Sequence, residues 1–405
     1  MISYLNQVKG NARKILLWHF GKEGAGAKFT IEIGSALAQK PERYLNFVAA
    51  EDSELADGLS QVQSLSYHSI SIFEGDKRSL SGLISAGLAL LKLPRIAYDF
   101  EKIIDQAKPD IMMCSFQSIW DLAALPLLRR SKIPFVLVLH DAEPHPGDRY
   151  PMRAQALRWE VNAADGLIVL SDHVGRSARQ LYNFPHSRIH KISHGRFDFC
   201  GTSVSARQFP DYRPFRLLFL GRIADYKGLP LLLSAYRDLQ NLNQSLSLTI
   251  AGSGDLGASK ALIESLPQTT LINTWLSDED ISNCLNEADA VVLPYTEASQ
   301  SGVAAAAFSA GLPIIATPVG GLMEQIEHGV NGLISTAVSA QALANSILEL
   351  STSPDLYNRL SSNAVHHAKT SLDWSIIADD VGNILDQILA LPRRNHFQKA
   401  ITNHL

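Results

Sequence analysis

Short, almost continuously apolar runs rich in β-branched and aromatic residues recur along the chain, and helical patterns such as 29–39 and 96–106 lie between several of them. Strands that are apolar on both faces and alternate with helices predict parallel sheets covered by helices on both sides. We therefore predict an α/β fold with two doubly wound, Rossmann-like sheets. The apolar runs are 15–20, 44–49, 111–116, 135–140, 166–170 and 189–193, then 215–220, 246–251, 270–275, 290–294 and 313–317.

The length of the chain favours two domains. At 405 residues it exceeds the size at which a single hydrophobic core stops growing. Residues 197–214 are rich in Gly, Ser and Pro without sustained periodicity, which is typical of a linker. We predict an N-terminal domain over 1–200, a C-terminal domain over 201–372, and a helix over 373–405 that packs back toward the N-terminal domain. Ser371 is its predicted N-cap, and two such domains facing each other form a cleft suited to a nucleotide.

Composition excludes several classes of protein. With 46% hydrophobic and 19% charged residues the chain is globular, and a net charge of −4 argues against binding of nucleic acid. Cys114, Cys200 and Cys284 lie far apart without a CxxC pair, so we predict neither a disulfide framework nor a zinc site, and a cytoplasmic location.

The longest apolar segment, 80–91, ends at Lys92 and is too short to span a membrane. The overlapping stretch 83–96, with Lys92 and Arg95, is interpreted as a core helix. The alternative is a peripheral contact of the N-terminal domain with the inner face of the membrane.

The sequence GRIADYKG at 221–228 places two cations on a loop between an apolar strand and a helix. Ligands of α/β sheets bind beyond the carboxyl ends of strands, where the following helix also attracts anions. The planar guanidinium of Arg222 and the ammonium of Lys227 are suited to two phosphates. The alternative is a pair of solvated loop cations.

A second motif, ASQSGVAAAAFSAGLPIIATPVGG at 298–321, combines a polar turn, a helix of small residues and a strand that ends in two glycines. The backbone amides of Gln300, Ser301, Gly302 and Val303 at the helix start are candidate ligands for a phosphate or a sugar oxygen. The alternative is a tightly packed core helix.

Together with WLSDEDISNCLNEADAVVLPY, these motifs resemble the C-terminal domain of retaining glycosyltransferases of family 4, which have the GT-B fold. The order and spacing agree over roughly 215–335, and weaker matches are VLHD at 138–141, ISHGRFD at 192–198 and DWSIIA at 373–378. The resemblance implies two Rossmann-like domains across a cleft, with a nucleotide-diphosphate sugar on the second domain and the acceptor on the first.

Site residues follow from this resemblance. Arg222 and Lys227 match the pair that stabilises the departing diphosphate, so no metal or other cofactor is expected, and His140 matches a histidine near the donor phosphate and the acceptor. His194 and Glu143 are weaker candidates. The predicted donor-binding residues are Gly221, Gly228, Gly252, Gly254, Leu276, Glu297, Gln300, Ser301, Gly302 and Val303, and the predicted acceptor or phosphate loop comprises Gly24, Gly26, Lys28 and His145.

The chain departs from the family at one point. Many members carry two glutamates eight positions apart, whereas this sequence has Ala298 or Ser299 at the first position and Ala306 or Ala307 at the second. Glu297 is the candidate replacement for the first glutamate. The Asp278–Asp280 acids are interpreted as a first helical turn capped by Ser277 rather than as metal ligands.

We therefore predict a retaining, metal-independent glycosyltransferase, hexosyltransferase-like, that acts in assembly of a surface polysaccharide or another glycoconjugate. Its partners would be a nucleotide-sugar donor and a glycan or lipid-linked acceptor, and no nucleic acid. A nucleotide-sugar epimerase and a non-catalytic nucleotide-sugar-binding protein are the alternatives.

Overall fold

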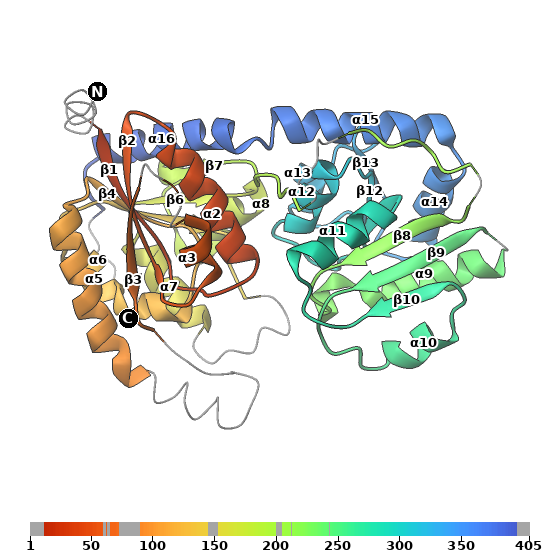
Figure 1. The fold of residues 1–405 in the computed structure, drawn as a ribbon, viewed down its shortest axis with the longest axis horizontal. Helices are drawn as coiled ribbons and strands as arrows, with labels where there is room; N and C mark the ends of the chain where they lie inside the picture. Colours follow the sequence, from red (N-terminus) through yellow and green to blue (C-terminus); the bar gives the residue numbers. More distant parts are fainter. Residues whose placement is uncertain are drawn as a thin grey trace.

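The computed structural model describes residues 12–59, 62, 65–72, 90–144, 153–199, 205–211, 213–242 and 244–394. They form two parallel sheets, one seven-stranded with the order β3-β2-β1-β4-β5-β6-β7 and one six-stranded with the order β10-β9-β8-β11-β12-β13 (Figure 1). The predicted α/β class with two doubly wound sheets is confirmed. In both sheets the order reverses beside the first strand, between β1 and β4 and between β8 and β11.

The strands agree with the predicted apolar runs to within three residues at each end, apart from two that were not predicted, β3 and β13. The first sheet contains β1 (Arg13–His19), β2 (Arg43–Ala50), β3 (Leu65–Ile70), β4 (Ile111–Cys114), β5 (Phe135–Leu139), β6 (Gly166–Val169) and β7 (Ile189–Lys191). The second contains β8 (Phe215–Leu220), β9 (Leu246–Ala251), β10 (Thr269–Ile272), β11 (Ala290–Leu293), β12 (Ile314–Ala316) and β13 (Gly332–Ile334).

Helices connect successive strands and cover both faces of each sheet. Around the first sheet they are α2 (Ala25–Ala38), α3 (Glu54–Leu59), α5 (Leu93–Ala107), α6 (Leu125–Arg130), α7 (Arg153–Ala163) and α8 (Asp172–Tyr182). Around the second they are α9 (Leu229–Asn241), α10 (Ser259–Ser265), α11 (Asp278–Glu287), α12 (Gly302–Ser309), α13 (Leu322–Gln325), α14 (Ala340–Ser351) and α15 (Pro354–Thr370), and α16 (Trp374–Ala390) ends the described chain. No helix of the described ranges is both long and apolar enough to cross a membrane.

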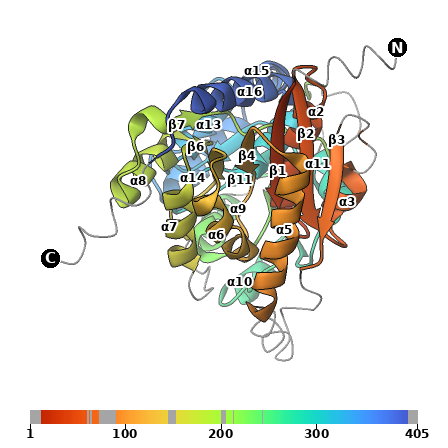
Figure 2. The same ribbon diagram turned by 90° about the vertical axis from the view of Figure 1, so that its left-hand side faces the viewer.

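Strand β1 shows why the first sheet is apolar on both faces. Ile15 and Leu17 pack into the core shared with α2 and α16, whereas Leu16 and Trp18 pack into the core under α5, α6 and α7 (Figure 2). Successive side chains of a strand point to opposite faces, so a strand between two helical layers needs apolar residues at every position. The start of the stretch 83–96 lies outside the described residues, but Ile96 is buried in this second core, as the core-helix interpretation predicts, while Leu91 is exposed.

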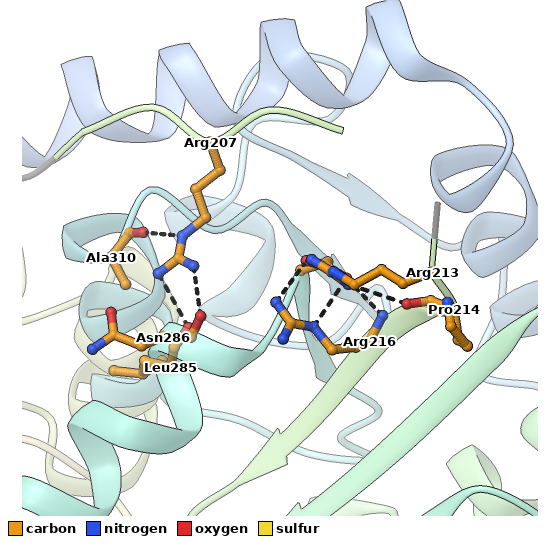
Figure 3. Close-up of polar contacts among 8 residues, drawn as sticks. Arg207, Arg213, Pro214, Arg216, Leu285, Asn286 and Ala310 are labelled. Carbon is orange, nitrogen blue, oxygen red and sulfur yellow. Dashed lines mark hydrogen bonds and ion pairs between the residues drawn. The ribbon is translucent and has the colours of Figure 1, made fainter. Parts of the chain in front are cut away.

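Two arginine clusters attach the segment before β8 to the second sheet (Figure 3). The guanidinium of Arg207 donates to the carbonyl oxygens of Leu285, Asn286 and Ala310 at 3.2, 2.9 and 2.9 Å. The carboxylate of Asp289, which is 2% exposed, accepts hydrogen bonds from the guanidinium groups of both Arg213 and Arg216. Much of this segment, which the sequence suggests is a linker, is therefore held against the second sheet.

Helices α15 and α16 run along one side of both halves of the molecule (Figure 1). The prediction that Ser371 caps the last helix is wrong, because Ser371 ends α15 and the carboxylate of Asp373 accepts from the Ser375 amide at 2.9 Å. Helix α16 packs against α2, and its Asp386 forms a two-pronged ion pair with Arg43 of β2, at 2.8 and 2.5 Å. Helix α16 is thus bound to the first sheet.

Candidate active site

The carboxyl ends of the strands at the two switch points carry the candidate site. In the first sheet His19 ends β1, and Ser115 and Phe116 follow β4. In the second sheet Gly221 follows β8 and Tyr295 follows β11. Ligands of doubly wound sheets bind at such points, because the loops there diverge and leave a crevice. The two halves also touch directly, because Ser171, which follows β6, donates through Oγ to the carbonyl oxygen of Ser299, in the segment after β11, at 2.8 Å.

The loop GRIADYKG is shaped by its two glycines. Gly221 has φ 108°, and Gly228 has φ 67° and ends a short helical turn over Asp225–Lys227. A Cβ on Gly228 would lie 1.9 Å from the Pro294 carbonyl oxygen, so only glycine allows the loop to pack against the chain that follows β11. This packing holds Lys227, the second cation of the loop, next to the end of β11.

Lys227 and Arg222 lie on aromatic rings at this point. The Lys227 ammonium sits 3.8 Å from the centroid of the buried Tyr295 ring, and the Arg222 guanidinium lies beside Tyr226, with Nη2 at 3.3 Å from its hydroxyl. Burial is the main reason that the pKa of Lys227 is lowered to about 8; the charge of Arg222 acts in the same direction, and Tyr226 and Asp141 oppose it. Because burial disfavours the charged form of this ammonium, an anion that binds next to it stabilises the charged form strongly.

The helix start at 300–303 lies next to the loop 221–228. We call this loop the clamp loop, and its two cations, Arg222 and Lys227, the clamp. Ser301 is the N-cap of α12, its amide donates to Gln325 Oε1 at 2.7 Å, and its hydroxyl lies 3.3 Å from the Tyr295 hydroxyl. Of the four amides predicted to bind an anion, that of Ser301 therefore already has a partner. A Cβ on Gly221 would touch Val303 at 3.4 Å, so this helix start and the clamp loop are neighbours.

Two further predicted glycines bring a third loop to the clamp. Gly252 has φ 143°, and a Cβ there would lie 1.9 Å from the Gly221 carbonyl oxygen. A Cβ on Gly254 would lie 2.1 Å from the Ile223 carbonyl oxygen, and Asn273 fixes Gly254 through two hydrogen bonds at 3.1 and 3.2 Å. The turn after β9 thus packs directly on the clamp loop through bare backbone.

The first sheet contributes three buried histidines. His140 directly follows β5 and is 2% exposed, His19 is 3% exposed, and His194 is 5% exposed. Burial lowers the pKa of each ring to about 4. Each ring also has one nitrogen on a backbone carbonyl, those of Phe116 for His19 (2.8 Å), Ser115 for His140 (2.9 Å) and Gly195 for His194 (2.8 Å).

These carbonyls determine the tautomers. A carbonyl oxygen only accepts, so the facing nitrogen carries the proton, namely Nδ1 of His19 and His194 and Nε2 of His140. The second nitrogen of each neutral ring is left as a hydrogen-bond acceptor. For His140 this atom, Nδ1, is buried without a partner in the described part of the chain. Near neutral pH the three rings present lone pairs to their surroundings.

Asp141 links the two halves electrostatically. It follows His140 in the sequence, and its negative charge raises the pKa of both His140 and Lys227. Burial, which lowers both pKa values, remains the larger effect. A carboxylate that acts on both groups lies near each of them. The clamp of the second sheet and the histidine of the first therefore converge on one place.

The predicted acceptor loop also contacts the second half. Gly24 has φ 87°, its amide donates to Glu54 at 3.1 Å, and a Cβ on it would touch the Trp275 ring at 3.3 Å. The Lys28 ammonium donates to Asp278 at 2.5 Å and lies over the Phe199 ring. Lys28 thus already has an anionic partner. Gly26 lies against His19, and His145 falls outside the described residues.

The region of the absent glutamates contains no buried carboxylate. Ala306 and Ala307 are buried inside α12, whereas Glu297 is exposed. Gly320 and Gly321 pack against the carbonyl oxygens of Ala298 and Ser299, where a Cβ would lie at 1.9 Å. Leu276 is partly buried between Trp275 and the start of α11, which Ser277 caps through a capping box with Asp280, as predicted.

Sequence reasoning missed His19, Asp141, Tyr295 and Glu324. His19 is the last residue of an apolar run, and its position at a strand end was the available signal. Glu324 of α13 reaches the other half, where it accepts from the amides of Asp172 and His173 at 2.6 and 2.8 Å. Nothing in the local sequence around Glu324 signals this contact.

Two family models match the chain on either side of the linker. The model described as glycosyl transferases group 1 matches residues 205–367, and the model described as glycosyltransferase family 4 matches residues 78–196. Between them they cover the second sheet and strands β4 to β7 of the first. The motifs GRIADYKG and ASQSGVAAAAFSAGLPIIATPVGG lie inside the first match, and His140 lies inside the second.

Curated relatives are similar at lower coverage. An α-D-kanosaminyltransferase from Streptomyces kanamyceticus is 24% identical over 63% of this chain and 71% of its own length. A glycogen synthase from Mycobacterium tuberculosis is 27% identical over 54% of this chain. The chain spans about half the length of that second relative, 53%.

Solved structures share the fold. The Anabaena protein HepE, in complex with UDP and glucose, aligns with a TM-score of 0.68 and 18% identity over 92% of this chain and 99% of its own. A sucrose-phosphate synthase from Thermosynechococcus elongatus aligns with a TM-score of 0.71 and 18% identity over 93% and 99%. The two sheets are therefore arranged as in the GT-B fold.

Proposed function

The chain belongs to glycosyltransferase family 4, the glycosyl transferases group 1, and from this membership we propose that it transfers a sugar from a nucleotide-diphosphate sugar to an acceptor hydroxyl. The observation that carries the proposal is the position of the Lys227 ammonium, 3.8 Å from the Tyr295 ring at the switch point of the second sheet. Arg222 lies on the same loop and adds a second charge.

The proposed mechanism follows from where charge develops. As the bond from the sugar to the diphosphate breaks, negative charge grows on the leaving group, and fixed cations lower the energy of that transition state. Lys227 and Arg222 supply this charge, and the start of α12, whose Val303 side chain lies next to Gly221, is proposed to add the amides of Gly302 and Val303. Because two cations neutralise the diphosphate, the proposed chemistry needs no metal.

The acceptor side is proposed to consist of His140 and the loop at 21–28. His140 is neutral near pH 7, so it orients a group by hydrogen bonding and does not supply a positive charge. Retention of the anomeric configuration is proposed from the family, with the leaving phosphate receiving the acceptor proton. The donor sugar would contact the turn at 297–303 through Glu297 and backbone atoms.

The donor and the pathway are finer proposals. A UDP-sugar is the first donor to test, because HepE was solved with UDP and glucose. Assembly of a surface polysaccharide or another glycoconjugate, with a glycan or lipid-linked acceptor, is proposed from the family resemblance. A cytoplasmic location, with or without peripheral contact of the N-terminal domain at the membrane, is also a proposal.

A panel of nucleotide sugars tests the function. Release of nucleotide diphosphate is measured with each donor, with and without glycan acceptors, for the wild type, Arg222→Ala and Lys227→Ala. Lys260→Ala, which removes an exposed lysine of α10, is the matched control. We expect both clamp variants to lose activity and the control to keep it. Full activity in both clamp variants would falsify the assignment, and a changed sugar nucleotide recovered without any acceptor would identify an epimerase.

A further inference from the structure

His19 is the buried histidine of the first sheet that lies against the glycine loop. The ring is 3% exposed and its Nδ1 donates to the Phe116 carbonyl oxygen, so Nε2 is the acceptor nitrogen. A Cβ on Gly21 would lie 2.3 Å from Nε2, and a Cβ on Gly26 would lie 3.1 Å from it. The lone pair of the ring therefore faces backbone that carries no side chain. No hydrogen bond from the described residues reaches Nε2.

The start of α2 lies at the same place. Its N-cap is Gly24 with φ 87°, which offers no side-chain cap, and Gly26 is the second residue of the helix. The first amides of a helix have no partner inside it and need an acceptor from elsewhere. Among the described residues, Glu54 accepts from the Gly24 amide at 3.1 Å, whereas no side chain accepts from the amides of Ala25, Gly26 or Ala27. An acceptor lone pair and donor amides thus meet around Gly26.

A hydroxyl group satisfies both. Its hydrogen can be donated to Nε2 of His19, and its oxygen can accept from the amides of Ala25, Gly26 or Ala27. A carboxylate has no hydrogen to give near pH 7, and a phosphate monoester has lost most of its second proton above about pH 6, so either would face the lone pair of a neutral ring with a negatively charged oxygen. The nearest lysine of the helix, Lys28, is already bound to Asp278 and offers no free charge. The geometry thus selects a neutral hydroxyl over an anion.

We propose that His19 and the uncapped start of α2 bind a hydroxyl group of the acceptor, and that the acceptor is a neutral, hydroxyl-bearing sugar at this position. The proposal rests on the proposed glycosyltransferase function. It assigns to His19 the role of a hydrogen-bond acceptor. The segment after β4 holds both rings, because the Phe116 carbonyl accepts from His19 and the Ser115 carbonyl accepts from His140. The same two-residue segment therefore orients the acceptor nitrogens of His19 and His140.

His19→Phe and His19→Gln test this assignment. Phenylalanine keeps a buried ring beside Phe116 and removes the lone pair, whereas glutamine retains an acceptor oxygen. With a UDP-sugar donor that the wild type turns over, acceptor KM is measured for a panel of methyl glycosides and for the 6-phosphate of each. We expect the wild type to use the neutral glycoside at least about tenfold better, and His19→Phe to raise its KM about tenfold, as loss of one hydrogen bond does. His19→Gln should recover part of the difference.

The control is His68→Phe, which alters a histidine within the edge strand β3. The Kd for UDP, measured calorimetrically, should stay within twofold in all variants, which shows that the donor half remains folded. An unchanged acceptor KM in His19→Phe, or a wild-type preference for the phosphorylated sugars, would overturn the hydroxyl assignment while leaving the glycosyltransferase function in place. Absence of both UDP binding and turnover in the wild type would instead overturn the proposed function.

Discussion

The two halves of the candidate site differ in the state of their charges. The second sheet presents Lys227 and Arg222, and burial makes the Lys227 ammonium costly until an anion arrives. The first sheet presents His19, His140 and His194, which burial keeps neutral. Burial thus poises one half for a negatively charged diphosphate and the other for uncharged hydroxyls. Desolvation acts on both, but the starting pKa values lie on opposite sides of neutral pH.

The largest expected effect comes from removing the charge of the second half. Lys227→Met keeps the length of the side chain and removes the ammonium, so we expect kcat to fall by about 100- to 1000-fold, or roughly 3–4 kcal/mol. Steady-state kinetics at saturating acceptor measure this loss. The comparison predicts that Lys227→Met lowers kcat, whereas His19→Phe raises mainly the acceptor KM. If both variants changed the same parameter, the division of roles between the halves would be wrong.

Backbone packing provides the next test. In Gly252→Ala the new Cβ would meet the Gly221 carbonyl oxygen at 1.9 Å at a φ of 143°, so we expect a loss of about 3 kcal/mol in the free energy of unfolding. Gly24→Ala is the matched change in the first half, at φ 87° but against the movable Trp275 ring at 3.3 Å. There we expect about 1–2 kcal/mol. Chemical denaturation measures both, and equal losses would show that the clamp loop can relax.

The fold could be predicted from the sequence because the strands are buried on both faces. The bounds of β8 and β9 agree with their apolar runs, since helices cover both sides of these strands. β3 was missed because LSYHSI lies at the edge of the first sheet and is only partly buried. β13 was missed because its sequence, GLI, follows a glycine-containing turn and begins with a glycine itself, so only two apolar side chains mark it.

The residues of the candidate site could be predicted where neighbours in the sequence mark them. Arg222 and Lys227 stand out because glycines flank them on a loop between a strand and a helix. His19 could not be assigned, because its role depends on the Phe116 carbonyl, 97 residues away, and on glycines that face its ring. The same holds for Glu324, whose amide partners are 152 and 151 residues distant. Sequence patterns describe neighbours along the chain, and these contacts form only when the sheets pack.

Acid should remove the stability that the buried neutral histidines of the first half contribute. The unfolded rings bind protons below their ordinary pKa of about 6.5, whereas the folded rings resist protonation until about pH 4. Stability contributed by the neutral rings is therefore complete above pH 6.5 and is lost as the pH falls toward 4, on the order of 1–3 kcal/mol for one ring. The buried carboxyls Asp121 and Glu160 of the same core have raised pKa values and act in the opposite direction. The free energy of unfolding of the wild type relative to His140→Phe isolates one ring, and chemical denaturation should show it to fall between pH 7 and 5. An unchanged difference would contradict the assignment of a neutral ring.

Alkali should act on the second half instead. Lys227 loses its proton above a pKa of about 8, so affinity for a nucleotide diphosphate should fall about tenfold per unit of pH above that value. In the unliganded protein the lowered pKa costs stability below pH 8, and this cost is relieved as the pH rises from 8 to 10.5, because over that range only the unfolded lysine still binds the proton. Titration calorimetry with UDP should show proton uptake on binding near pH 8.5. Lys227→Arg should abolish both the uptake and the alkaline loss, since guanidinium stays charged.

The smallest expected effect tests how the two halves are held together. Glu324 of α13 accepts from the amides of Asp172 and His173 at the start of α8, and its carboxylate lies 3.6 Å from Arg176 and 3.7 Å from Lys191. Glu324→Gln keeps one acceptor oxygen and removes the charge, so we expect a loss of about 0.5–1 kcal/mol, and Glu324→Ala should lose about twice as much. Glu349→Gln, on the exposed side of α14, is the control. Because the contact joins the halves without touching either set of charges, both UDP affinity and acceptor KM should shift together in Glu324→Ala. A change in only one of them would place Glu324 with that half of the site instead.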